Sequence, residues 1–326
     1  RALLRHAVLR NNVMKPILIA ECCQNHNGQR DLLQRMIHEA AAAGADYLKM
    51  QTIRSRELAF RERFENGETD SSGKTKTIKR PFGAEKERLS KLDLAPGDEA
   101  WFVRECQRAG VKSMTTVFTR DAVRDVKDVG FDAIKIASYD CRSLPLLRDV
   151  KKYWSTLVVS TGATLDTEIE AAAQVLEGTN YTFLHCVTLY PTPLNQLHLR
   201  RMAYLRRFTP QVGFSDHTAP AVTAMKASQA ALALGATCVE RHFTVLGPTE
   251  TRDGPVSITP AMLKELRAFA DKPRPAQMTE LRETYPGWEE TLGEMFRPLS
   301  DGELLNRDYY AGRFASMVNG RPIYNW

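Results

Sequence analysis

Short apolar runs alternate with amphipathic helical stretches along most of the chain, and this alternation limits the possible folds more than any other feature. Eight units of one strand and one helix between residues 15 and 270 predict an α/β chain that forms a (β/α)₈ TIM barrel with a short C-terminal extension. Gly110 and Gly130 follow two of the helices at positions where glycine commonly ends a helix. A doubly wound open sheet has the same local alternation and stays the alternative.

The expected strands are 17–20, 47–52, 113–118, 133–137, 156–160, 182–187, 211–214 and 238–243. The expected helices are 31–43, 98–109, 121–129, 144–153, 167–176, 197–208, 221–234 and 260–270.

Three segments lie outside the repeat. Residues 1–14 form a basic arm ahead of the barrel, and its position before Met14 suggests that it precedes the native start. Residues 53–96 separate the second strand from its helix, and an insertion of this length is commonly a lid or binding loop. Residues 271–326 lack a strong period, so we expect a tail that packs on the barrel or on a neighbouring copy.

Composition excludes several classes of protein. Hydrophobic residues make up 43% and charged residues 26% of the 326 residues, which is typical of a globular chain, and no apolar run is long enough to span a membrane. The six cysteines have no paired spacing, which indicates reduced thiols and, without a signal peptide, a cytoplasmic protein. The net charge is +6, of which Arg1, Arg5, Arg10 and Lys15 supply +4, and no nucleic-acid-binding motif accompanies it.

Polar residues gather where the predicted strands end, which is where a barrel carries its chemistry. Lys49 and Lys135 occupy corresponding strand positions, and an amide or a hydroxyl follows each within three residues. Lysine is rarely buried without a partner, so the two suggest an anion held between ammonium groups, with a buried ion pair as the alternative. The polar strand-end residues are Glu21, Lys49, Gln51, Thr116, Lys135, Ser138, Ser160, Thr161, His185, Ser215, His217, Glu240 and His242.

His217 and His242 end consecutive strands, so a barrel places them side by side, as a divalent-metal site requires. Asp253 or Glu21 would add an oxygen ligand, whereas a hydrogen-bonded core histidine is the alternative for each imidazole. Cys22 and Cys23 are adjacent and point to opposite faces of a strand, so we assign them no redox role.

Eight motifs follow one another in order along the predicted barrel. They are IAECCQNHNG, ADYLKMQT, TTVFTR, FDAIKIASYD, VVSTGAT, FLHCVTLYPTP, VGFSDHT and VERHFT. In combination they resemble the sialic acid synthase family of nonulosonate synthases. The resemblance implies a barrel that condenses phosphoenolpyruvate with an open-chain amino sugar such as N-acetylmannosamine, giving a nine-carbon 2-keto-3-deoxy acid and phosphate.

The resemblance also assigns roles to residues. It implies that phosphoenolpyruvate is held by Lys49, Lys135, Ser138, Ser160 and Ser215, with Thr116 nearby, and that His217 and His242 bind Mn²⁺, with Mg²⁺ or Co²⁺ as alternatives. The residues implied to face the sugar or the reacting carbons are Glu21, Gln51, Tyr190, Glu240 and Asp253. Glu21 or Glu240 would orient or deprotonate the attacking water. A homodimer is the expected assembly.

The chain departs from the family pattern in three places. The C-terminal antifreeze-like domain, which supplies an arginine to the partner's sugar site in the family, is not expected in residues 271–326, and Arg313 or Arg321 is a candidate replacement. The loop GPTETRDGPVSITP keeps only Asp253 of the family's run, and TTVF lacks the usual proline. All three departures touch recognition of the sugar.

Two other functions remain open. The basic residues between Arg54 and Lys91, eleven against seven acidic ones, would suit a phosphorylated aldose in another phosphoenolpyruvate-dependent keto-deoxy acid synthase. A non-catalytic sugar-binding barrel is the alternative from another class, but loss of catalysis usually removes the costly buried charges first.

Overall fold

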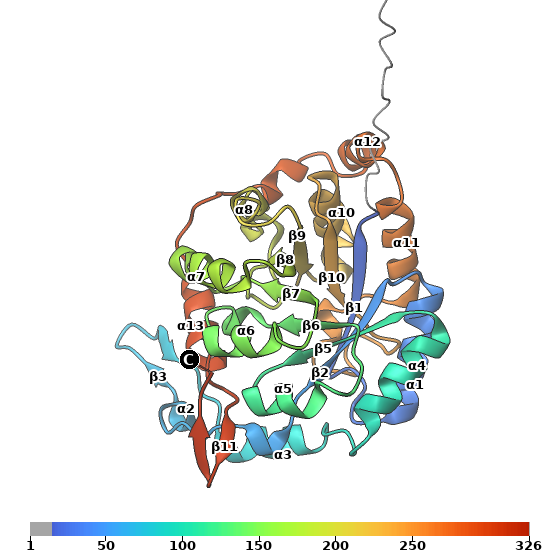
Figure 1. Cartoon of the computed structure of the whole chain (residues 1–326). Coiled ribbons are helices and arrows are strands. Elements are labelled where there is room, and N and C mark those ends of the chain that lie inside the picture. The colour runs from blue at the N-terminus through green and yellow to red at the C-terminus, as the bar shows by residue number, and fades with distance from the viewer. Residues whose placement is uncertain (1–14, 326) are drawn as a thin grey trace, which may run out of the picture.

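A closed barrel of eight parallel strands forms the centre of the molecule (Figure 1), in the order β1-β10-β9-β8-β7-β6-β5-β2. The computed structural model describes residues 15–325, so the basic arm predicted for residues 1–14 lies outside the described residues. The barrel confirms the predicted (β/α)₈ fold and excludes the open sheet. Its strands are β1 Ile17–Cys23, β2 Tyr47–Thr52, β5 Lys112–Val117, β6 Ala133–Ile136, β7 Thr156–Ser160, β8 Asn180–His185, β9 Val212–Asp216 and β10 Cys238–His242.

Helices surround the barrel (Figure 1) and bury their apolar faces on the outward residues of the strands, such as Leu18 and Ile134. These helices are α1 Arg30–Ala42, α4 Asp98–Ala109, α5 Arg120–Val126, α6 Leu144–Val150, α7 Asp166–Leu176, α8 Arg201–Leu205, α9 Pro220–Thr223, α10 Lys226–Ala233 and α11 Pro260–Ala270. None of the helices within residues 15–325 has the length and apolarity needed to cross a membrane.

Two predicted helices differ most in extent from the structure, while the helices expected at 121–129 and 144–153 end three residues earlier, at Val126 and Val150. The helix expected at 197–208 is reduced to α8, because the backbone N–H groups of Leu199 and Arg200 bond to carbonyls of Thr291 and Leu292 in the tail. The helix expected at 221–234 is divided into α9 and α10 at Ala224, which has a φ of 48°.

The insertion 53–96 is folded. It contains the 3₁₀ turn η1 Ser55–Glu57, α2 Arg63–Asn66, a hairpin of β3 Glu68–Thr69 and β4 Thr75–Thr77, and α3 Phe82–Ser90. Short 3₁₀ turns also follow barrel strands at η2 Ser138–Asp140, η3 Leu194–Gln196 and η4 Gly254–Val256.

The tail carries regular structure that its weak period did not predict: α12 Arg274–Thr284, η5 Trp288–Thr291, α13 Asp301–Tyr310, β11 Ser316–Val318 and β12 Arg321–Ile323. Helix α12 packs on α10 (Figure 1). Helix α13 contacts β4 of the insertion. Arg61 of the insertion donates to the carbonyls of Tyr309 and Ala311, and Leu58 forms a β-bridge with Phe314. The insertion and the tail therefore form one structure beside the barrel.

Candidate active site

The barrel interior changes from apolar to polar along the strands. A floor of inward side chains closes the amino-terminal half: Ile19, Tyr47, Met114, Ala133, Val158, Leu184 and Cys238. Because side chains alternate along a strand, the residue two positions further on faces the same interior. Those positions hold Glu21, Lys49, Thr116, Lys135, Ser160, Cys186 and Glu240. The strand register thus places several predicted site residues directly above the floor.

A cavity of about 430 Å³ opens above these residues. Its lining includes all thirteen site residues that the sequence analysis assigned: Glu21, Lys49, Gln51, Thr116, Lys135, Ser138, Ser160, Tyr190, Ser215, His217, Glu240, His242 and Asp253. Two other strand-end residues lie elsewhere. His185 is buried with its Nε2 2.7 Å from the Leu197 carbonyl oxygen, and Thr161 donates to the Leu184 carbonyl.

Lys49 lies among carboxylates at the inner end of the cavity. It is 3% exposed, forms an ion pair with Glu21 and donates to Thr116 Oγ1 at 2.9 Å. Its Nζ is 3.7 Å from Glu240 Oε2, which is too long for a hydrogen bond. Burial lowers the pKa of Lys49 to about 7; Glu240 opposes this shift, and the charge of Lys135 adds to it.

Lys135 lies on the other side of Glu240. Its Nζ donates to Ser160 Oγ at 2.6 Å and is 3.7 Å from Glu240 Oε1, while Ser215 donates to the same carboxylate at 2.7 Å. Burial alone would raise the pKa of Glu240, but the charges of Lys135 and Lys49 and the Ser215 hydroxyl hold it well below its usual range. The carboxylate is therefore ionised at neutral pH and shared by both lysines.

The two histidines are neighbours, as predicted. Their ring centroids are 5.5 Å apart, and the ring of Tyr190 lies 4.4 Å from that of His217. His217 Nδ1 lies 3.1 Å from the Val187 carbonyl oxygen, so it carries the proton, and the lone pair is on Nε2, which lies 3.5 Å from Ser215 Oγ. Burial lowers the pKa of His217 to about 4 and also lowers that of His242, so both rings are neutral, the form that binds metals.

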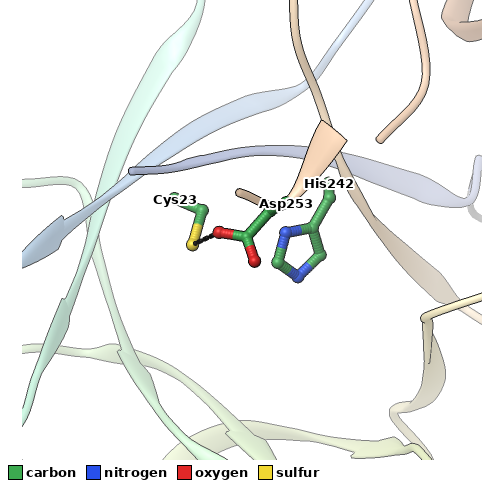
Figure 2. Close-up of side chains that lie close together, drawn as sticks. All are labelled: Cys23, His242 and Asp253. Carbon is green, nitrogen blue, oxygen red and sulfur yellow. Dashed lines mark hydrogen bonds between the residues drawn. The ribbon is translucent and has the colours of Figure 1, made fainter. Parts of the chain in front are cut away.

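His242 also belongs to a group with the donor atoms of a metal site (Figure 2). The possible ligand atoms of Cys23, His242 and Asp253 all lie within 4.8 Å of one another. His242 Nδ1 is buried with no hydrogen-bond partner among the described residues. An imidazole nitrogen, a carboxylate and a sulfur fit a divalent transition metal. His217 lies beside this group but is not a member of it.

Arginines gather at the outer part of the cavity, and the sequence analysis named only one of them. Arg88 and Arg313 both form ion pairs with Glu85, and Arg252 lies 3.8 Å from the same carboxylate. Burial would raise the pKa of Glu85, but these cations lower it to about 2. With Arg80, the arginines come from the insertion, the loop after β10 and the tail, so no local motif marks them.

A closed parallel barrel that gathers buried lysines, carboxylates and histidines in one cavity at the carboxyl ends of its strands is a (β/α)₈-barrel enzyme. The NeuB family model matches residues 36–277, and the chain belongs to that family. This confirms the resemblance to sialic acid synthases, and the chain is an enzyme of the nonulosonate synthase type.

Two curated relatives come from Campylobacter jejuni subsp. jejuni serotype O:2. The chain is 30% identical over 266 residues to an N,N'-diacetyllegionaminic acid synthase, covering 77% of this chain and 74% of the relative. It is 27% identical over 314 residues to a pseudaminic acid synthase, covering 94% and 83%. The N-acetylneuraminic acid (sialic acid) synthetase of Leptospira borgpetersenii serovar Hardjo-bovis, solved in complex with citrate, has the same fold, with a TM-score of 0.66, 24% identity, and coverage of 91% and 92%.

Proposed function

We propose that this enzyme condenses phosphoenolpyruvate with the aldehyde of an open-chain amino sugar and releases a nine-carbon 2-keto-3-deoxy acid and phosphate. One observation supports this above the others: six cationic side chains line the cavity against three carboxylates, and two of the cations are lysines buried at its inner end. Such an excess of positive charge suits a small polyanion.

Phosphoenolpyruvate would bind at the inner end. The Nζ atoms of Lys49 and Lys135 both lie 3.7 Å from carboxylate oxygens of Glu240, so neither ammonium group donates a hydrogen bond to that carboxylate. An ammonium group has three donors, and the free ones would contact the phosphate and the carboxylate of the substrate. The hydroxyls of Ser138, Ser160 and Ser215 would supply further hydrogen bonds. Lys49 also forms a buried ion pair with Glu21, the alternative that the sequence left open, and we propose that Lys49 binds the substrate in addition.

The bond changes require an electrophilic aldehyde and a positioned water. The C2–C3 double bond of phosphoenolpyruvate supplies the electron pair for a bond from C3 to the aldehyde carbon, and the aldehyde oxygen takes a proton. Water adds to C2 and loses one proton, which leaves a hydroxyl group on C2. Cleavage of the bond from C2 to the phosphate oxygen then releases phosphate, which takes the remaining hydroxyl proton and leaves the keto group. Glu21 or Glu240 would orient this water or accept its proton.

The outer half of the cavity would hold the acceptor. Gln51, Tyr190 and Asp253 line the cavity; Tyr190 lies beside both histidines, and Asp253 lies beside His242. A divalent cation, Mn²⁺ by the family resemblance with Mg²⁺ or Co²⁺ as alternatives, would be held at His217 and His242 and would polarise the aldehyde oxygen as a Lewis acid. The same resemblance leads us to propose a cytoplasmic homodimer.

A phosphorylated acceptor is the second candidate, and the arginines favour it. Arg88, Arg252 and Arg313 surround the single carboxylate of Glu85, which leaves positive charge for an anionic group at the outer end of the acceptor. In this case Arg313→Ala should raise KM for the acceptor about tenfold or more while KM for phosphoenolpyruvate stays constant. Arg321, exposed on β12, is the matched control.

The test is phosphate release from phosphoenolpyruvate by metal-stripped protein, with and without Mn²⁺, with the product mass recorded. The acceptors are N-acetylmannosamine, its 6-phosphate, a 2,4-diacetamido hexose and arabinose 5-phosphate. Metal-dependent release with a nine-carbon product is the expected result, and the best acceptor separates the two candidates. A product of eight carbons, or release without an acceptor, would contradict the proposal.

A further inference from the structure

Cys23 is placed in the cavity by an irregular end of β1. The register between β1 and β2 shifts between Glu21 and Cys23, and Cys23 has a φ of 46°, in the left-handed region that side chains other than glycine rarely adopt. Of the six cysteines, all of them among the described residues, Cys23 alone lines the cavity. The local backbone therefore directs one particular thiol toward the site.

The thiol meets two other potential ligands from separate parts of the chain (Figure 2). Cys23 Sγ donates a hydrogen bond to Asp253 Oδ2 at 2.8 Å, and Figure 2 shows the carboxylate of Asp253 between the thiol and the His242 ring. The ligand atoms lie within 4.8 Å of one another. Donors that share an ion with bonds of about 2.0–2.3 Å lie somewhat under 4 Å apart, so small side-chain rotations would let all three reach one ion.

Other roles for the thiol fit less well. Cys23 has no partner for a disulfide in the cavity, because every other cysteine is outside the cavity lining. The thiol–carboxylate hydrogen bond satisfies Sγ and Asp253 but leaves His242 Nδ1 buried without a hydrogen-bond partner within residues 15–325. A metal ion between the three side chains would satisfy all of them.

We propose that Cys23 is a thiolate ligand of the catalytic divalent cation proposed above at His217 and His242, and that Asp253 is a further ligand, so that the site accepts sulfur-tolerant ions such as Co²⁺, Zn²⁺ or Fe²⁺ more tightly than Mg²⁺. That this cation is catalytic rests on the proposed function. That Cys23, His242 and Asp253 bind a cation does not. When the ion binds, the bond from sulfur to the metal replaces the S–H bond, and the proton is released to solvent.

Cobalt gives a direct test on the metal-stripped full chain. A thiolate bound to Co²⁺ has a charge-transfer absorption band in the near ultraviolet that nitrogen and oxygen ligands do not give. We expect this band in the wild type, with release of about one proton per Co²⁺ bound. Cys23→Gly should abolish the band and weaken Co²⁺ binding at least about tenfold.

Two variants make the result interpretable. Glycine tolerates a positive φ, so Cys23→Gly relieves the local backbone and is expected to fold. Cys186→Ser is the matched control, because Cys186 is buried and contacts Ser138 beside the same cavity but does not face Asp253; its band should persist. No band in the wild type, or a band that survives in Cys23→Gly, would overturn the proposal.

Failure of the metal proposal and failure of the proposed function give different results. Metal-dependent condensation without a thiolate band would refute Cys23 as a ligand and leave the function intact. A thiolate band that Cys23→Gly abolishes, with no condensation for any acceptor, would establish the ligand and refute the proposed function.

Discussion

Binding of phosphoenolpyruvate should weaken as pH rises above 7, because Lys49 loses its charge there. Burial lowers the pKa of Lys49 to about 7 in the free protein. A bound phosphate and carboxylate favour the charged ammonium and raise that pKa, so the complex holds a proton that the free protein has partly lost. Affinity is therefore greatest below the free pKa and falls as pH rises through it.

The size of the change in affinity for phosphoenolpyruvate follows from the fraction of the free protein in which Lys49 is protonated. About half of the free protein carries the proton at pH 7 and about 1% at pH 9, so the apparent Kd should rise about 50-fold, or about 2 kcal/mol, over this range. At pH 8 the protein should take up about 0.9 of a proton for each phosphoenolpyruvate bound.

Isothermal titration calorimetry at pH 7, 8 and 9, in buffers of different ionisation enthalpy, measures both Kd and proton uptake. In Lys49→Arg the guanidinium does not titrate, so the dependence should flatten while the positive charge remains. Lys135→Arg is the matched control and should keep the dependence, since Lys49 is retained. A wild-type Kd constant within about twofold from pH 7 to 9, or unchanged pH dependence in Lys49→Arg, would refute the reasoning.

Three further substitutions test the framework of the site. In Gly213→Ala the new Cβ would lie 2.2 Å from a carbonyl oxygen of the neighbouring strand, so urea unfolding should show a loss of about 1–3 kcal/mol or more; unchanged stability would mean that β9 can shift. Asp216→Asn breaks a fully buried pair with Arg241, 2.6 Å apart, and should cost about 3–5 kcal/mol in the same assay, whereas a loss under about 1 kcal/mol would show that Arg241 finds another partner. Ser215→Ala removes the 2.7 Å hydrogen bond to Glu240 and should lower kcat/KM about 10–100-fold with unchanged unfolding; unaltered kinetics would exclude a role for this bond.

The barrel was predictable because its signal is local and repeated. Strand β2 and helices α4 and α11 have the predicted bounds, because their signals are local. Apolar spacing marks each segment, a glycine follows the end of α4, and a proline begins α11. The helix expected at 197–208 failed for the opposite reason. Backbone groups of Leu199 and Arg200 bond to residues of the tail that lie some ninety positions away in the sequence, and no local pattern reveals such a partner.

The inner half of the site was predictable for the same reason as the barrel. Once a strand is placed, alternation directs Lys49, Lys135 and Glu240 to the interior above the apolar floor. Cys22 and Cys23 were expected on opposite faces of a strand and were assigned no redox role. The register shift that turns the Cys23 thiol inward lies beyond Ala20, where the first strand was expected to end. Its position depends on pairing with β2, which the sequence does not show.

The residues predictable from local sequence and those placed by distant contacts also have different proposed roles in the cavity. The groups proposed to bind phosphoenolpyruvate lie on barrel strands, except for Ser138 in η2. On the strands, a substitution such as Gly213→Ala is expected to disturb neighbouring strands. The arginines proposed to contact the acceptor come from the insertion, a loop and the tail, which contact each other through Arg61 and α13. Changes there can alter the choice of sugar without disturbing the barrel. Substitutions of Arg88 and Arg313 should therefore change KM for the acceptor, and substitutions of Lys49 and Lys135 should change KM for phosphoenolpyruvate.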